Sequence, residues 1–386
     1  MRKSDLPGQP TWTRRDVLRR GGETALALGL AGPAAELLSA CGGGGGASAT
    51  ATSAAVKAPT PSEIANASGT LKVLGWSYYQ VPEFQTAKVK AKWGYLGTNE
   101  ETITKARQAG TFDLTTITSQ YEPQLRKAQR IEPIVPSLIP NLGNVDPVFR
   151  DSQTTRFDGK TWGIPLQWGY GYLEYNAAEV SKPQSLDDLM APKLRKKIGM
   201  PDDPFAVITT FAILTHQPQP TQLTKDQFNA VLDALNNFKS QILTIHQYGE
   251  EPAILARGDI LVDFPAYGPS FLTASKGGVQ MKITLLGAFS YMDCWSAYEG
   301  ANLPLAYAYM NQSLRPEAQL ACVTKGAAFP VVSAAKSAVP GPLQYQSAAA
   351  VIKEAPLVPG PPADASGGKV PFSEWITAWE QFKTSV

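Results

Sequence analysis

Hydrophobic positions in the body of the chain follow two different periods. Short apolar runs bounded by turn residues predict strands at 70–76, 112–117, 197–200, 260–264 and 281–286. Apolar residues three and four positions apart predict helices at 98–109, around Leu125 and Ala128, and at 204–214, 224–238, 303–310 and 372–382. Because strands and helices alternate, the pattern predicts an α/β protein with mostly parallel sheets.

Several helix ends carry local signals. Thr98-Asn99-Glu100-Glu101 has the spacing of a capping box, and Gly110 is suited to close the helix that follows. Thr224 is placed to cap an amphipathic helix whose apolar face consists of Phe228, Val231, Leu232, Leu235 and Phe238. A second apolar stripe with helical spacing predicts packing rather than ligand contact, and it consists of Trp375, Ile376, Trp379 and Phe382.

Composition limits the classes of protein that the chain can belong to. With 386 residues and 43% hydrophobic residues, the chain can form two domains that each bury a core. The formal charge of +2, from 35 basic and 33 acidic residues, gives no electrostatic basis for binding nucleic acid. Only two histidines and three cysteines are present, so most zinc sites and His-based catalytic sites lack their residues. We expect no metal and no cofactor.

The sequence also lacks the familiar catalytic motifs. It has no Gly-x-Ser-x-Gly, no His-Glu-x-x-His and no Cys-x-x-Cys. Gly169-Tyr170-Gly171 begins like a dinucleotide-binding loop, but Glu174 stands where the third glycine should be. The pattern favours a binding protein over an enzyme. Because carboxylates are plentiful, an exported carbohydrate-active hydrolase with paired carboxylates in an aromatic cleft stays open as the alternative, beside a scaffold without a ligand.

The first 40 residues have the layout of an export signal. Six Lys and Arg residues precede or flank a short apolar stretch at 25–35, which is shorter than the ~20 residues that span a membrane. The segment from Thr13 to Arg19 resembles the twin-arginine export motif, with Val17 where an aromatic residue is usual. Leu38-Ser39-Ala40-Cys41 resembles the box that a lipoprotein signal peptidase cleaves. We therefore expect a twin-arginine lipoprotein signal peptide over 1–40.

Cys41 would become the first residue of the mature protein and carry the lipid anchor. Several acyl chains at one site hold a protein to a membrane where one chain is marginal. Five glycines follow, and the small and polar residues to about 69 predict a flexible tether over 41–69. The expected location is the outer face of the cytoplasmic membrane. In an exported protein, Cys294 and Cys322 could form a disulfide, which the sequence leaves open.

Between about Leu71 and Lys336, several stretches resemble those of a known protein family in their order and spacing. These stretches lie at 74–79, 99–101, 109–114, 139–147, 163–169, 185–189, 291–293 and 306–317. In them the chain resembles the spermidine/putrescine-binding family of ABC-transporter substrate-binding proteins. The resemblance implies a two-lobed, periplasmic-binding-protein-like α/β fold in which two crossing strands form a hinge.

The resemblance also implies where the lobes divide. One lobe would be built from 70–168 plus 293–337, and the other from 169–292 plus 338–386. The hinge would run near Trp168-Gly169 and near Asp293, which we expect at a strand end. The protein would be a monomer that captures a small cationic solute and delivers it to a permease in the membrane.

Family members bind ammonium groups with acidic side chains and pack the methylene chain between aromatic faces. In this sequence, the family's ligand-binding positions fall on Trp76, Tyr79, Ser119, Tyr121, Asp203, Tyr291 and Asp293. The resemblance makes Asp293 the principal ammonium-binding carboxylate and Asp203 a second acidic position. Tyr78 alternates with Tyr79 and could equally face the cleft.

Three positions depart from the family's pattern. Ala206 stands where a glutamate is frequent, and Tyr291 stands where a tryptophan is common. Ala266 falls where another tryptophan is expected, although Tyr267 is next to it. With one carboxylate fewer, the site would suit a shorter or singly charged amine, or a different solute. A putrescine- or spermidine-like amine is the expected ligand.

Overall fold

The structure, a computed structural model, describes residues 57–96, 99–106, 110–268, 270–325 and 329–386. The twin-arginine motif, Cys41 and most of the expected tether lie outside the described residues. Among the described helices, none is long and apolar enough to cross a membrane.

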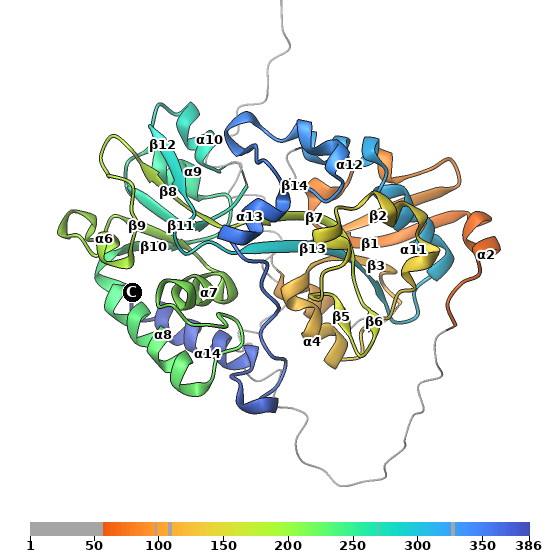
Figure 1. Cartoon of the computed structure of the whole chain (residues 1–386), viewed down its shortest axis with the longest axis horizontal. Helices are drawn as coiled ribbons and strands as arrows, with labels where there is room; N and C mark the ends of the chain where they lie inside the picture. Colours follow the sequence, from red (N-terminus) through yellow and green to blue (C-terminus); the bar gives the residue numbers. More distant parts are fainter. Residues whose placement is uncertain (1–56, 97–98, 107–109, 269, 326–328) are drawn as a thin grey trace, which may run out of the picture. The chain divides into compact units, whose positions relative to one another are not determined.

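The first sheet has seven strands and mixes parallel with antiparallel pairs. Their order is β14 (Phe329–Pro330), β7 (Ile164–Tyr170), β13 (Ser290–Tyr298), β3 (Leu114–Thr118), β1 (Gly69–Gly75) and β2 (Val89–Tyr95), with β4 (Ile131–Glu132) beside β13 (Figure 1). Strand β1 pairs in parallel with β2 and β3, whereas β13 runs antiparallel to β3, β4 and β7. A short separate hairpin is formed by β5 (Arg156–Phe157) and β6 (Lys160–Thr161).

The second sheet has five strands. Their order is β10 (Ile242–His246), β9 (Ile198–Pro201), β11 (Val262–Ala266), β8 (Tyr172–Asn176) and β12 (Met281–Thr284). Strand β9 is parallel to β10 and β11, while β8 is antiparallel to β11 and β12. The prediction of mostly parallel sheets is therefore wrong. The chain passes from one sheet to the other between β7 and β8 and again between β12 and β13, and these strands run against their neighbours.

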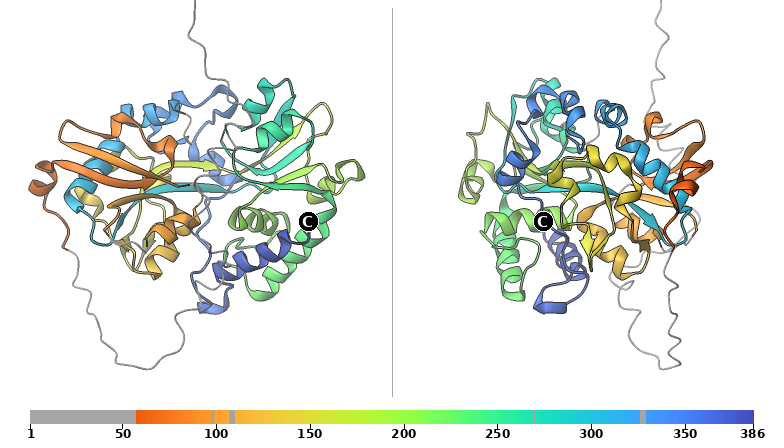
Figure 2. Two further views of the ribbon diagram at one scale, coloured as in Figure 1. Left: turned by 180° about the vertical axis from the view of Figure 1, so that it is seen from behind. Right: turned by 45° about the vertical axis from the view of Figure 1, so that its right-hand side comes forward.

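Helices cover both faces of the second sheet. On one face lie α7 (Pro204–Leu214), α8 (Lys225–Phe238) and α14 (Phe372–Lys383), and on the other lie α9 (Glu251–Ala256) and α10 (Ser270–Lys276), as Figures 1 and 2 show. The remaining described α-helices are α2 (Pro61–Ala65), α3 (Glu100–Ala106), α4 (Glu122–Lys127), α5 (Pro147–Arg150), α6 (Leu186–Leu189), α11 (Leu303–Ser313), α12 (Pro316–Thr324) and α13 (Ala348–Glu354).

Helices with strong local signals are found where the sequence predicts them. Helix α7 covers 204–214, and α8 begins directly after Thr224, whose hydroxyl accepts a hydrogen bond from the backbone N–H of Gln227. Trp375 and Trp379 of α14 are fully buried, which confirms that the stripe on this helix packs in the core. Gly110 has a φ of +76°, the left-handed conformation that favours glycine.

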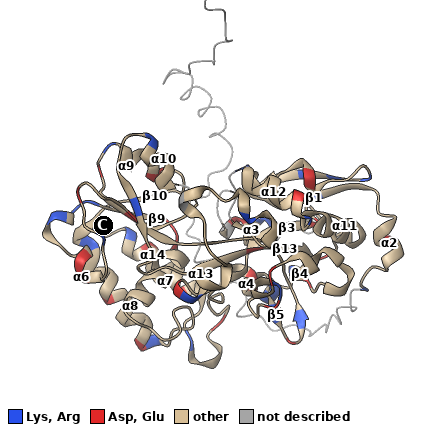
Figure 3. Cartoon of the chain, turned by 45° about the horizontal axis from the view of Figure 1, so that its top comes forward, with Lys and Arg blue, Asp and Glu red and all other residues tan. Residues whose placement is uncertain are grey.

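The charged residues and the two described cysteines do little to constrain the fold. Figure 3 shows Lys and Arg as well as Asp and Glu scattered over the ribbon, and both kinds occur near α6. Cys294 and Cys322 are both buried and free, so the described structure contains no bridge between them.

Candidate functional site

Asp293 lies at the centre of a group of hydroxyl donors. The sequence led us to expect Asp293 at a strand end, but it lies inside β13. The register between β13 and β7 shifts directly after Asp293. Thr118 lies opposite it on β3, and its hydroxyl donates to Asp293 Oδ1 over 2.7 Å. The Tyr79 hydroxyl donates to Asp293 Oδ2. Shifts of this kind recur beside functional sites, where they redirect a side chain.

Asp293 carries a buried negative charge that the described protein does not neutralise. Only 3% of the residue is exposed, and burial raises the pKa of its carboxyl, while the hydrogen bonds from Tyr79 and Thr118 act in the opposite direction. No Lys or Arg among the described residues forms an ion pair with it. A buried carboxylate in this situation is suited to receive a cation from a ligand.

Two tyrosine rings lie against Gly169, which is in β7, and Gly171, which follows β7. Tyr291 of β13 pairs with Gly169 of β7, and a Cβ atom at Gly169 would lie 2.8 Å from Cε1 of Tyr291. Gly171 is two residues further along the chain, and a Cβ atom there would lie 3.2 Å from Cε1 of Tyr267. Alternate strand positions share a face, so the two glycines admit two rings side by side. This close approach explains the Gly-Tyr-Gly sequence without a dinucleotide.

The rings of Tyr291, Tyr267 and Tyr248 form what we call the tyrosine series. Ring centroids are 5.5 Å apart between Tyr291 and Tyr267, and 5.7 Å apart between Tyr267 and Tyr248, in edge-on geometry. At the far end, the Tyr248 hydroxyl donates to Asp203 Oδ2 over 2.9 Å. The series thus connects the surroundings of Asp293 with those of Asp203.

Asp203 differs from Asp293 in its partners. It caps the N-terminus of α7, because its Oδ1 accepts the backbone N–H of Ala206 over 2.9 Å. Its Oδ2 is bonded to the Tyr248 hydroxyl, and only 8% of the residue is exposed. Both carboxylate oxygens are therefore already engaged with hydrogen-bond donors of the protein.

The first aromatic loop follows β1 as a 3-10 helix over Ser77–Tyr79. The rings of Trp76 and Tyr78 are stacked with centroids 6.0 Å apart, and both residues are half-buried. Tyr79 is buried and meets Tyr78 edge-on at 4.6 Å. Tyr79 is therefore the residue that binds Asp293 through its hydroxyl, while Tyr78 and Trp76 are less deeply buried.

Ser119 and Tyr121 lie in a second 3-10 helix directly after β3. Tyr121 is buried and packs edge-on against Phe205 and Phe372, with centroids 6.0 Å and 5.3 Å away. It also lies near Tyr248, since Tyr121 contributes to raising the pKa of the Tyr248 phenol, after desolvation and the charge of Asp203. Ser119 is completely buried, and its hydroxyl donates to Gln120 Oε1 over 3.4 Å.

Sequence reasoning missed two residues of this site. Thr118 lies one residue beyond the strand predicted at 112–117, and its position opposite Asp293 depends on the pairing of β13 with β3. Tyr248 follows β10, which the hydrophobic pattern did not predict, and its partner Asp203 is 45 residues away. No local signal identifies either residue. Among the described residues, no group of three or more His, Cys, Asp or Glu side chains could hold a metal ion.

Solved structures of other proteins have the same fold. PotD, the spermidine/putrescine ABC transporter substrate-binding protein of Streptococcus pneumoniae strain Canada MDR_19A, in complex with calcium and HEPES, is 19% identical, with a TM-score of 0.67 over 82% of this chain and 99% of that chain. The TpPotD lipoprotein of Treponema pallidum is 16% identical, with a TM-score of 0.61 over 82% and 99% of the two chains. The PBP MotA of A. tumefaciens B6, in complex with glucopine, is 14% identical, with a TM-score of 0.60 over 82% and 100%.

These likenesses confirm the predicted two-lobed, periplasmic-binding-protein-like fold. They do not determine the ligand, because the proteins compared have different ligands. A family model for bacterial extracellular solute-binding proteins matches residues 111–355, which include most of the site described above. The chain belongs to this family of bacterial extracellular solute-binding proteins.

Proposed function

We propose that the protein is the substrate-binding component of an ABC importer and that it captures a small cationic amine at Asp293. One observation carries this proposal: Asp293 is a 3% exposed carboxylate that receives two hydroxyl hydrogen bonds and no ion pair among the described residues. A cation at about 4 Å from such a carboxylate gains roughly 4 kcal/mol at an effective dielectric near 20, before desolvation is subtracted.

The aromatic residues of the candidate site support the same ligand class. Trp76 and Tyr291 are both half-buried, while Tyr79 and Tyr121 are buried. An ammonium group over an aromatic face gains about 0.5–2 kcal/mol. In the proposed pose, the ammonium lies against Asp293, the methylene groups lie along these rings, and the far end of a putrescine- or spermidine-like ligand points toward Asp203.

Binding would be coupled to closure of the two lobes. We assign 70–168 plus 293–337 to one lobe and 169–292 plus 338–386 to the other, with the hinge near Trp168-Gly169 and near Asp293. Asp293 and Asp203 then contribute from opposite lobes. A ligand that contacts both lobes stabilises the closed state by the difference between its affinities for the closed and open states.

The proposed cellular role places the protein outside the cytoplasmic membrane. The segment 1–40 would direct export through the twin-arginine route, and lipid on Cys41 would anchor a monomer through the 41–69 tether. The tether would allow the loaded lobes to reach a permease in the same membrane.

Isothermal calorimetry with putrescine, spermidine, a quaternary amine, and neutral and anionic solutes tests the ligand. We expect an amine to bind and its affinity to fall at least tenfold in Asp293→Asn, which is about 1.4 kcal/mol. The control is Asp188→Asn, because Asp188 is likewise a hydrogen-bonded carboxylate but accepts the backbone N–H groups of Gln184 and Ser185 at the start of α6, outside the site. Tight binding of an anionic or neutral solute that is unchanged in Asp293→Asn would refute the amine while leaving solute binding in place.

A further inference from the structure

The end of the site farthest from Asp293 is formed by a hydroxyl–carboxylate pair. Asp203 uses one oxygen to cap α7 and the other to accept the Tyr248 hydroxyl. Tyr248 is 47% exposed, whereas Asp203 is 8% exposed. A ligand that reaches this end therefore meets the phenol before it meets the carboxylate.

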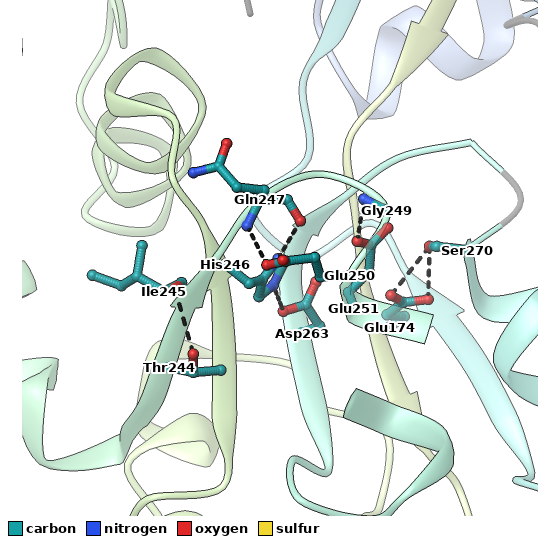
Figure 4. A network of polar contacts seen from close by, with 10 residues as sticks. All are labelled: Glu174, Thr244, Ile245, His246, Gln247, Gly249, Glu250, Glu251, Asp263 and Ser270. Atoms are coloured by element: carbon teal, nitrogen blue, oxygen red, sulfur yellow. Dashed lines mark hydrogen bonds and ion pairs between the residues drawn. The ribbon is translucent and has the colours of Figure 1, made fainter. Parts of the chain in front are cut away.

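A partly buried polar network fixes the segment that carries Tyr248 (Figure 4). His246 Nε2 lies 2.8 Å from Asp263 Oδ1, and His246 Nδ1 lies 3.1 Å from the Gln247 carbonyl. On the other side of Tyr248, the Gly249 N–H donates to Glu251 Oε2 over 2.7 Å. Tyr248 is thus held between anchored residues on both sides.

The same network also connects Tyr248 to the segment that contains Asp203. The His246 carbonyl accepts the backbone N–H of Asp202 over 2.8 Å, and His246 pairs with Pro201 between β10 and β9. Tyr248 and Asp203 therefore follow two paired strands and meet beyond their ends. Their hydrogen bond is a consequence of strand register and is prepared before any ligand arrives.

We propose that Tyr248 determines specificity at the end of the ligand site distal to Asp293, and that it selects a hydrogen-bond donor rather than a second positive charge. This inference rests on the proposed binding of a cationic amine at Asp293. The ligand class is then an amine with one required charge and a donor group, O–H or N–H, at its other end.

The chemistry of the phenol supports this selection. Because the Tyr248 proton is directed to Asp203, the phenol oxygen keeps its lone pairs for a ligand donor. A distal ammonium that replaced the Tyr248 hydroxyl on Asp203 Oδ2 would cost the protein a charge-assisted hydrogen bond. A ligand with an apolar end would leave the phenol oxygen without a partner after water is excluded.

Three four-carbon amines separate the effect of a second charge from that of a hydrogen-bond donor at the distal end: putrescine, 4-amino-1-butanol and n-butylamine. Measured by calorimetry on the wild-type protein, putrescine and 4-amino-1-butanol should bind within about threefold of each other, and n-butylamine should bind at least fivefold more weakly than either. A wild-type preference for putrescine over 4-amino-1-butanol of more than threefold would overturn the inference, because Asp203 would then act as a counter-ion.

The Tyr248→Phe variant tests the phenol itself. Its preference for 4-amino-1-butanol over n-butylamine should fall at least threefold, and putrescine should gain relative to 4-amino-1-butanol, because the Tyr248 hydroxyl no longer donates to Asp203 Oδ2. A smaller fall would refute the role of Tyr248. The control is Tyr307→Phe on α11, whose hydroxyl accepts the Val135 N–H over 2.7 Å outside the tyrosine series. If no amine bound, or if Asp293→Asn bound the amines with unchanged affinity, the proposed function itself would fail.

Discussion

His246 forms a buried ion pair that we expect to make the protein less stable at alkaline pH. Only 4% of the His246 surface is exposed, and His246 Nε2 lies 2.8 Å from Asp263 Oδ1. The other oxygen of Asp263 is buried and has no hydrogen-bond partner among the described residues. Loss of the imidazolium would therefore leave a buried carboxylate with less compensation for its charge.

The magnitude follows from the pKa of His246. Burial alone would lower this pKa, but the hydrogen bond and the charge of Asp263 outweigh burial and raise the pKa from 6.5 to about 9. A histidine with a raised folded-state pKa stabilises the protein fully below pH 6.5, and this stabilisation is lost as the pH rises through about 9. The raised pKa of His246 therefore corresponds to about 3 kcal/mol of folding stability, which is lost between pH 6.5 and about 9.

Urea unfolding between pH 6 and pH 10 tests this value on the wild-type protein and on His246→Asn. We expect the wild type to lose about 3 kcal/mol more than the variant as the pH rises. The buried carboxyls Glu174 and Glu251 have raised pKa values because of burial, so their charging also lowers stability as the pH rises, in both proteins. The control is His216→Asn, because His216 is exposed and has a φ of +58° that Asn tolerates. Parallel pH profiles for wild type and His246→Asn would refute the assigned pKa.

Further predictions concern the crossing strand, the core and the anchor. In Gly169→Ala, the new Cβ should displace the Tyr291 ring and weaken amine binding, whereas Gly143→Ala, where a Cβ would meet nothing within 4 Å, should leave the calorimetric affinity unchanged. Trp375→Ala should lower the free energy of unfolding by about 3–5 kcal/mol, because Trp375 is completely buried, and a loss below 1 kcal/mol in urea unfolding would contradict its core position. Cys41→Ala should release the protein from the membrane fraction, and a variant that stays bound would refute the anchor.

The hydrophobic pattern predicted the helices that carry local signals, but it did not predict the crossing strands β7 and β13, which only the family resemblance indicated. Helix α8 has a capping box at Thr224 and one apolar face, and both features depend only on residues within the helix. Strand β7 is buried at all seven positions and β13 at all but one, so neither has the alternation that identifies a strand. The prediction of mostly parallel sheets failed for the same reason, because these crossing strands supply antiparallel pairs.

The candidate site was predicted in part because a family pattern can place residue types but not their partners. The sequence placed Asp293 and Asp203 in the site, and the structure adds the donors that distinguish them. Thr118 reaches Asp293 through strand register, and Tyr248 reaches Asp203 through a loop after an unpredicted strand. Such contacts depend on tertiary structure and leave no periodic signal in the sequence.

The different partners of the two carboxylates support the proposal that one positive charge on the ligand is sufficient. Asp203 lies at the N-terminus of the eleven-residue helix α7, where the helix dipole and the Ala206 N–H already stabilise a negative charge. Asp293 lies in a strand, receives hydroxyl bonds from Tyr79 and Thr118, and has its pKa raised by burial. Electrostatic compensation is therefore more complete at Asp203 than at Asp293. A ligand cation gains most where compensation is least complete, so the charge belongs at Asp293 and the hydrogen-bond donor at the end lined by Tyr248.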